Sequence, residues 1–202
     1  MRSSHRGSKP RAAWCPPERR QYARAVDLVS LFPTRLSAAG VSGCALQMLR
    51  LESPGFFLSG TVMSDLSLVR YRGFANLPEA GALRRRVEQE QPAHLRHRIH
   101  LVIAQGSDGS LVAGDSHHYD AATESCADEA VYDLLHDEFR AVIGQAPPAV
   151  RERSTGTYAV ANDRAVLMEA PSPRTRLVVA TSGVGASTGF AIGEEVIDEL
   201  VN

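Results

Sequence analysis

The chain has 202 residues and a mass of 21.8 kDa, which is the size of one domain of ordinary length. Apolar residues make up 44% of it and charged residues 22%, and these values exclude a collagen-like or wholly disordered chain. No apolar run approaches the roughly 20 residues of a membrane-spanning helix, and Cys15, Cys44 and Cys126 form no CxxC pair. We therefore expect a soluble, cytoplasmic protein with reduced thiols and no membrane partner.

The charge is distributed unevenly along the chain. The net formal charge is −1, yet residues 1–24 contain seven basic residues and one acidic residue. This arm has no apolar periodicity, no interleaved aromatic residues and no apolar segment of a signal peptide. We expect residues 1–30 to be a basic, poorly ordered extension that binds no nucleic acid, and residues 31–202 to form the folded domain.

Hydrophobic periodicity and proline positions predict the elements of the first half. The first expected helix stops before Pro33, because the residue preceding proline is pushed out of the α region. The following strand alternates, with Cys44 and Leu46 on one face and Gln47 and Leu49 on the other. In chain order we expect a helix over 22–31, a strand over 43–50, an irregular connection over 52–62 and a helix over 78–91 that Pro92 ends.

The second half contains the clearest strand pattern. Two apolar runs flank the sequence GSDG over 106–109, whose glycines and aspartate suit a hairpin loop, and Gly144 lies where a helix C-cap is expected. In order we expect strands over 99–105 and 110–114, a helix over 122–143, strands over 150–161, 166–169 and 177–181, and a helix over 187–200. Because few strands alternate with helices, the pattern predicts an α+β fold with a mainly antiparallel sheet and flanking helices.

A glycine-rich turn over 183–185 lies between the last strand and the last helix. The sequence GVG lets the backbone approach a ligand, and the free amides of the helix N-terminus favour an anion or an electron-rich ring oxygen. The full spacing is GxGxxxG, not the GxGxxG of a dinucleotide site, and no second strand follows. A tight turn that only eases helix packing is the competing interpretation.

The segment GDSHHYD over 114–120 is the second candidate site. His117 and His118 with two nearby carboxylates could ligate a metal, and His94, His97 and His100 could contribute. Adjacent strand residues point to opposite faces, however, so one ion would not readily take both imidazoles. A polar wall beside a bound ligand and ordinary surface histidines remain the alternatives, and our prediction includes no metal. A serine nucleophile would need a GxSxG elbow, which is absent.

Several segments together resemble one known family. The segments are LQMLR (46–50), MSDLSLVRY (63–71), GDSHHY (114–119), RSTGTYAVANDRAVLMEAP (153–171) and LVVATSGVGASTGFAIGEEVIDEL (177–200). They are similar to the C-terminal part of FAD-dependent oxidoreductases of the D-amino acid oxidase and sarcosine oxidase superfamily. The resemblance is closest to the members associated with phosphonate catabolism, and it begins near Leu31. It implies an antiparallel substrate domain that covers the isoalloxazine ring of FAD.

The resemblance also assigns roles to particular residues. It implies that His117, His118 and Tyr158 are catalytic or line the substrate cavity. It implies that the last loop and helix start contact the flavin through Ser182, Gly183, Val184, Gly185 and Ser187. Amides and a helix dipole there would stabilise negative charge on the reduced ring.

Departures from the family narrow the expected function. Gly156 stands where covalent relatives have the cysteine joined to the flavin, so the FAD should be non-covalent, and Ser187 stands where a carboxylate-binding lysine occurs. The resemblance therefore favours a small amine with another anion, such as an aminoalkylphosphonate or its N-alkyl derivative.

The N-terminal Rossmann half of the family has no counterpart in this sequence. We therefore expect a fragment of an amine-oxidising flavoenzyme whose other half is encoded upstream or carried by a separate chain, and which is inactive alone. The alternatives are a catalytically silent domain that binds a small anion, and a metal hydrolase.

Overall fold

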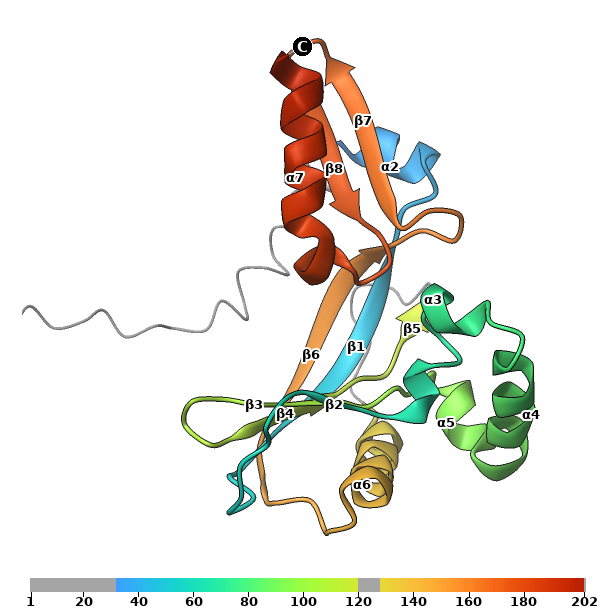
Figure 1. Cartoon of the computed structure of the whole chain (residues 1–202), viewed down its shortest axis with the longest axis vertical. Coiled ribbons are helices and arrows are strands. Elements are labelled where there is room, and N and C mark those ends of the chain that lie inside the picture. The colour runs from blue at the N-terminus through green and yellow to red at the C-terminus, as the bar shows by residue number, and fades with distance from the viewer. Residues whose placement is uncertain (1–31, 120–127, 202) are drawn as a thin grey trace, which may run out of the picture.

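The computed structural model describes residues 32–119 and 128–201, and it has the α+β architecture with antiparallel sheets that the sequence predicts. Figure 1 shows a larger sheet, whose two long strands β1 (Ser42–Leu51) and β6 (Val150–Val160) extend toward a separate two-stranded hairpin. The basic extension over 1–30 and the helix expected over 22–31 lie outside the described residues.

The remaining strands are shorter, and the longest helices are α6 and α7. The strands are β2 (Val62–Met63), β3 (Val102–Gln105), β4 (Leu111–Gly114), β5 (His118–Tyr119), β7 (Val166–Ser172) and β8 (Thr175–Ala180). The helices are α2 (Pro33–Ala38), α3 (Arg72–Ala75), α4 (Ala80–Glu90), α5 (Pro92–Arg96), α6 (Glu129–Ile143) and α7 (Gly185–Val201), with a 3₁₀ turn η1 over Asp65–Ser67.

Strand β1 is the centre of the larger sheet. One of its edges pairs with β6 along its whole length, while the other edge pairs with β4 at one end and with β5 at the other. Leu49 belongs to the main apolar core, whereas Cys44 and Leu46 belong to a separate buried cluster. The predicted alternation is therefore confirmed, and the two faces of β1 have different neighbours.

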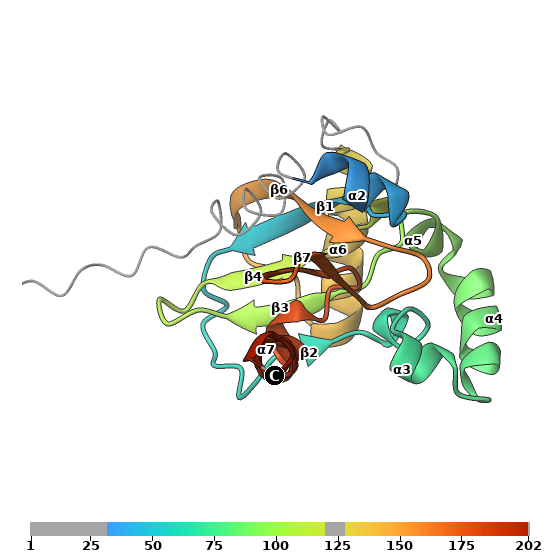
Figure 2. The same cartoon turned by 90° about the horizontal axis from the view of Figure 1, so that it is seen from above.

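Helix α6 covers the Leu49 face of the sheet (Figure 2). Its residues Tyr132, Leu135 and Phe139 are buried against the strands, and each such side chain contributes about 1.5–3 kcal/mol through burial. The Asp128 side chain accepts a hydrogen bond from the amide of Ala130 at 3.0 Å, so it caps the N-terminus. Gly144 ends the helix with φ +76°, as expected. Residues 122–127 of the predicted helix lie outside the described residues.

The β3–β4 hairpin confirms the predicted loop over 106–109. Asp108 Oδ1 accepts hydrogen bonds from the amide and the hydroxyl of Ser110 at 3.1 and 2.6 Å. Gly109 has φ +79°, which a residue with a side chain adopts only with strain. Strand β3 begins at Val102, later than the predicted residue 99, so His100 lies in the connection before it.

The β7–β8 hairpin lies between two helices, with α2 on one face and α7 on the other (Figures 1 and 2). Leu36 of α2 is buried against Leu167, Leu177 and Val179. Helix α7 contacts β8 but contains no fully buried residue. Its apolar side chains therefore lie mostly at the surface.

Several boundaries differ from the predictions for physical reasons. Pro92 opens α5 instead of a loop, because proline is well tolerated at the first helical position. Val62, the last residue of the predicted irregular connection, instead forms β2 together with Met63 by pairing with β3. Strand β7 runs on to Ser172 through a register shift that accommodates Pro171, and α7 begins at Gly185, not at residue 187.

Candidate functional site

Three neighbouring strands bring a cysteine and two tyrosines into one row. Cys44 on β1 lies directly opposite Tyr119 of β5 and Tyr158 of β6, so the three side chains share the face that does not contact α6. Burial raises the pKa of the Cys44 thiol to about 11, even though Arg70 opposes the shift. The thiol is therefore protonated at neutral pH and is not a nucleophile.

Arg70 projects from the segment after η1 toward this row. Its Nη2 donates a hydrogen bond to the Tyr158 hydroxyl at 2.7 Å and lies 3.5 Å from the Tyr119 hydroxyl. Its Nε is buried and has no hydrogen-bond partner among the described residues, and no carboxylate within that part of the chain pairs with it. The guanidinium thus keeps donor capacity and a positive charge for a ligand.

The tyrosine and the arginine influence each other electrostatically. Burial raises the pKa of Tyr158, and the positive charge of Arg70 only partly opposes this. Burial alone would lower the pKa of Arg70, but the neighbouring Tyr158 and Tyr119 hold it above its ordinary value. At neutral pH the pair is therefore a neutral phenol beside a charged guanidinium.

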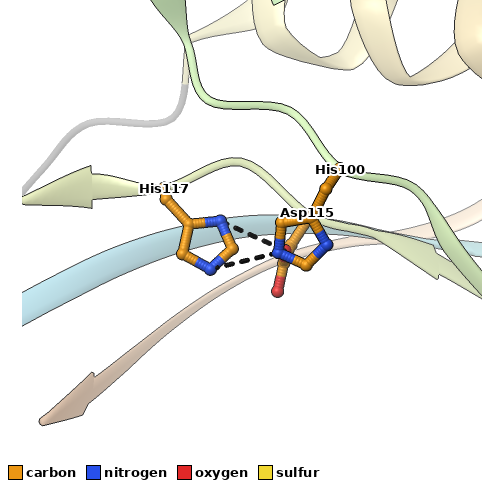
Figure 3. Close-up of side chains that lie close together, drawn as sticks. All are labelled: His100, Asp115 and His117. Carbon is orange, nitrogen blue, oxygen red and sulfur yellow. Dashed lines mark hydrogen bonds and ion pairs between the residues drawn. The ribbon is translucent and has the colours of Figure 1, made fainter. Parts of the chain in front are cut away.

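Two histidines and an aspartate converge beside the row (Figure 3). Asp115 Oδ1 lies 3.0 Å from His100 Nε2 and 3.3 Å from His117 Nδ1, and the Nε2 atoms of the two imidazoles are 3.3 Å apart. The two histidine side chains are buried. Burial lowers the pKa of His117 to about 2, with further contributions from His100 and Arg70. The His117 imidazole is therefore neutral across the physiological range.

Two adjoining cavities open on these groups and share Arg70, Tyr71 and Tyr158 as lining. The first, which we term the arginine cavity, has a volume of about 320 Å³. The second, which we term the histidine cavity, has a volume of about 310 Å³. The arginine cavity is also lined by Tyr119, Asn162, Thr181, Ser182 and Val184, and the histidine cavity by His100, Asp115, His117, Gly183 and Gly185.

The glycine-rich loop reaches both cavities from the far side. Ser182 Oγ donates to the carbonyl of Ala165 at 3.1 Å, which holds the loop against β7. Gly183 has φ +76°, and a side chain there would meet no atom within 4 Å. At Gly185, in contrast, an added Cβ would lie 3.0 Å from Cβ of Ala180. The loop is therefore open to a ligand at Gly183 and tightly packed at Gly185.

The structure brings together most, but not all, of the predicted site residues. His117, Tyr158 and residues 182–185 line the cavities, whereas His118 and Ser187 line neither. The ring of His118 instead contacts His97 at 6.0 Å between centroids, and Ser187 Oγ donates to the carbonyl of Val184 at 3.0 Å.

Arg70 is the residue that sequence reasoning missed. It occurs in the segment MSDLSLVRY, but nothing in its spacing gives it a role. The sequence predicts only that the carboxylates of the segment over 114–120 and His100 could contribute to a metal site. Their proximity to His117 depends on long-range backbone pairing.

The chain matches no protein-family model, and no curated protein is significantly similar to it. Within residues 32–119 and 128–201, no helix has the length and apolar character needed to cross a membrane.

Proposed function

We propose that this chain is the substrate side of an FAD-dependent oxidoreductase that oxidises the carbon–nitrogen bond of a small amine bearing an anionic group. One observation carries the proposal. The loop expected to contact the flavin, residues 182–185, and two of the three residues expected on the substrate side, His117 and Tyr158, line the same pair of cavities. These segments are far apart in the sequence and belong to different sheets.

The residues present fit the ring end of a flavin and not its adenosine end. The loop leaves open space at Gly183, and the 17-residue helix α7 begins directly after it, so free amides and the positive helix end are available. In the described ranges every strand pairing is antiparallel, so they contain no βαβ unit for the pyrophosphate. When bound, FAD would supply the acceptor for a hydride equivalent from the carbon beside nitrogen.

Arg70 would bind the anionic group of the substrate. Its Nε has no partner in the described part of the chain, and its Nη2 is oriented by the Tyr158 hydroxyl. A guanidinium with free donors pairs well with a phosphonate or carboxylate. The hydroxyls of Tyr119 and Tyr158 lie beside the guanidinium and add hydrogen-bond donors for the same group.

His117 would act through hydrogen bonding and not by storing a proton. Burial is the main reason why the pKa of His117 is lowered to about 2. The imidazole is therefore a weak base at neutral pH. The ring nitrogen that carries its proton can donate a hydrogen bond to the anionic substrate, and the ring would help exclude water from the reacting carbon.

The nucleotide-binding half would come from outside the described residues, in a separate or upstream-encoded segment. The exposed apolar residues Phe190, Ile197 and Val201 lie on one face of α7, because they are spaced by seven and four positions. This face directly follows the loop expected at the flavin, so we assign it to contact with that half.

The test is to purify the chain alone and together with the polypeptide encoded immediately upstream, and to measure bound FAD. The chain alone should be colourless, and the combined product should carry one non-covalent FAD. Gly183→Asn should lower FAD content, because asparagine tolerates φ > 0 yet fills the open space, while Phe57→Asn on a distant exposed loop should not. Absence of flavin in every combination would favour the silent anion-binding domain instead.

A further inference from the structure

Three potential metal-ligand atoms from two separate segments meet beside the histidine cavity. They belong to His100, before β3, and to Asp115 and His117, between β4 and β5, and they all lie within 4.8 Å of one another. Two imidazoles and one carboxylate form the ligand set of many three-residue zinc and iron sites, with the remaining positions open.

The distances suit a shared ion. Ligand atoms at 2.0–2.2 Å from a tetrahedral Zn²⁺ lie roughly 3.3 Å from one another. Asp115 Oδ1 is 3.0 Å from His100 Nε2 and 3.3 Å from His117 Nδ1, and one ligand atom from each of the three residues lies within 4.8 Å of the other two. In Figure 3 the His117 ring faces the His100 ring and the Asp115 carboxylate, with one dashed line from each of its two nitrogens.

Hydrogen bonding alone accounts poorly for this arrangement. Asp115 Oδ1 and His117 Nδ1 are buried, and neither makes a hydrogen bond with acceptable geometry within the described residues, although they are neighbours. Buried polar atoms are nearly always satisfied, so unsatisfied ones need an explanation. An ion bound between them would satisfy both.

The backbone fixes all three residues in advance. His100 and Asp115 exchange two hydrogen bonds, from each amide to the other carbonyl, at 3.0 and 2.9 Å, and the amide of His117 donates to the carbonyl of His97 at 3.3 Å. The rings also have aromatic neighbours, since Tyr71 lies 5.5 Å from His100 and Tyr158 lies 5.8 Å from His117, both edge to face. Such support orients ligands for a metal.

We propose that His100, Asp115 and His117 bind one divalent transition-metal ion of the zinc class, with its open position toward the histidine cavity. Asp115 would supply the one negative charge among the three ligands, so the bound dication would keep a net positive charge. Arg70 lines the same cavity and adds a second positive charge. The open position therefore suits water or an anionic ligand oxygen. The site does not depend on the flavin, and its test uses the metal alone.

The test is titration of the purified full chain, freed of metal by a chelator, with Co²⁺ and Zn²⁺. One equivalent of Co²⁺ should give the visible absorption of a low-coordinate site, and Zn²⁺ should displace it. Asp115→Asn and His117→Ala should each weaken Zn²⁺ binding at least tenfold in competition with a chromogenic chelator. His136→Ala on α6 removes an imidazole that lies outside the cluster, and it should bind like the parent chain.

Thermal unfolding of each variant separates loss of a ligand from loss of the fold, and Asp115→Asn keeps the test valid if the alanine variant is unfolded. An absorption spectrum typical of Co²⁺ in water would overturn the proposal. Unchanged Zn²⁺ affinity in Asp115→Asn would also overturn it, because the ion would then be bound elsewhere in the chain.

Discussion

Arg70 is the residue on which recognition of an anionic ligand depends most. It is the cation shared by both cavities, and its guanidinium is oriented by Tyr158 at 2.7 Å and flanked by the Tyr71 ring at 5.1 Å. Arg70 is half-buried, and a partly desolvated charge with no carboxylate partner in the described residues is costly. The position of the Arg70 guanidinium at both cavities therefore favours a ligand that carries a negative charge.

Replacing Arg70 with methionine should weaken binding of aminomethylphosphonate to the full chain at least tenfold, which corresponds to about 1.4 kcal/mol. Methionine keeps much of the side-chain volume but removes the charge and the donors. Calorimetric titration measures the effect. Arg84→Met on the exposed surface of α4 is the matched control, and equal affinity in the two variants would remove Arg70 from the anion site.

Glu138 is a second residue whose environment has a measurable consequence. It is buried on α6, and burial raises the pKa of its carboxyl above the ordinary 4.5. His94 lies 3.8 Å away, and burial lowers its pKa. Because its lowered pKa leaves His94 uncharged at neutral pH, this contact is not an ion pair there.

A raised folded-state pKa of an acid means that its contribution to stability is complete below pH 4.5 and is lost as the pH rises through the folded pKa. Glu138→Gln should therefore match the parent near pH 4 and be more stable at pH 8, by up to about 1 kcal/mol because Oε2 has no partner in the described residues. Denaturant unfolding at both pH values measures this, with exposed Glu194→Gln as control. Lower stability of Glu138→Gln at pH 8 would contradict the assignment.

At the scale of elements, the close approach of β4 to β1 positions the Asp115 segment. Gly114 pairs with Met48, and a Cβ at Gly114 would lie 2.9 Å from Met48 Cγ and 3.4 Å from its Cα. Only glycine therefore allows this spacing directly before Asp115.

Gly114→Ala should destabilise the fold by about 1–3 kcal/mol through overpacking, and it should weaken Zn²⁺ binding because Asp115 moves with the strand end. Gly60→Ala, where nothing lies within 4 Å of an added Cβ, is the matched control. Denaturant unfolding and Zn²⁺ competition give the two readouts. Parent-like stability in Gly114→Ala would show that Met48 moves aside without cost.

Helix α7 presents an apolar face that the described residues do not cover. Phe190 is 96% exposed, Val201 73% and Ile197 57%, which is unusual for three large side chains on one helix face. Under the proposed function, this face would contact the nucleotide-binding half.

Phe190→Glu should leave the thermal stability of the chain unchanged, because the side chain makes little contact, but it should weaken association with the upstream-encoded half at least tenfold. Sedimentation of the mixed polypeptides measures association. Phe57→Glu, at a phenylalanine that is 84% exposed elsewhere, should associate normally. Equal association of both variants would place the contact away from α7.

At the scale of the whole molecule, local patterns predicted the elements and long-range pairing determined the site. The alternation of β1, the capping glycine at 144 and the loop over 106–109 depend on local chemistry, and all are confirmed. The meeting of His100 with Asp115 depends on a backbone pair between two separate segments, which no spacing rule in the sequence encodes. Arg70 was missed for the same reason.

The amine oxidoreductase assignment is tested most directly by the flavin itself. In the product that combines this chain with its nucleotide-binding half, aminomethylphosphonate or an N-alkyl derivative added without oxygen should bleach the absorption band of the bound oxidised flavin. One equivalent of substrate should reduce one flavin, and Arg70→Met should require a much higher substrate concentration. Full FAD occupancy with no bleaching by any anionic amine would contradict the account.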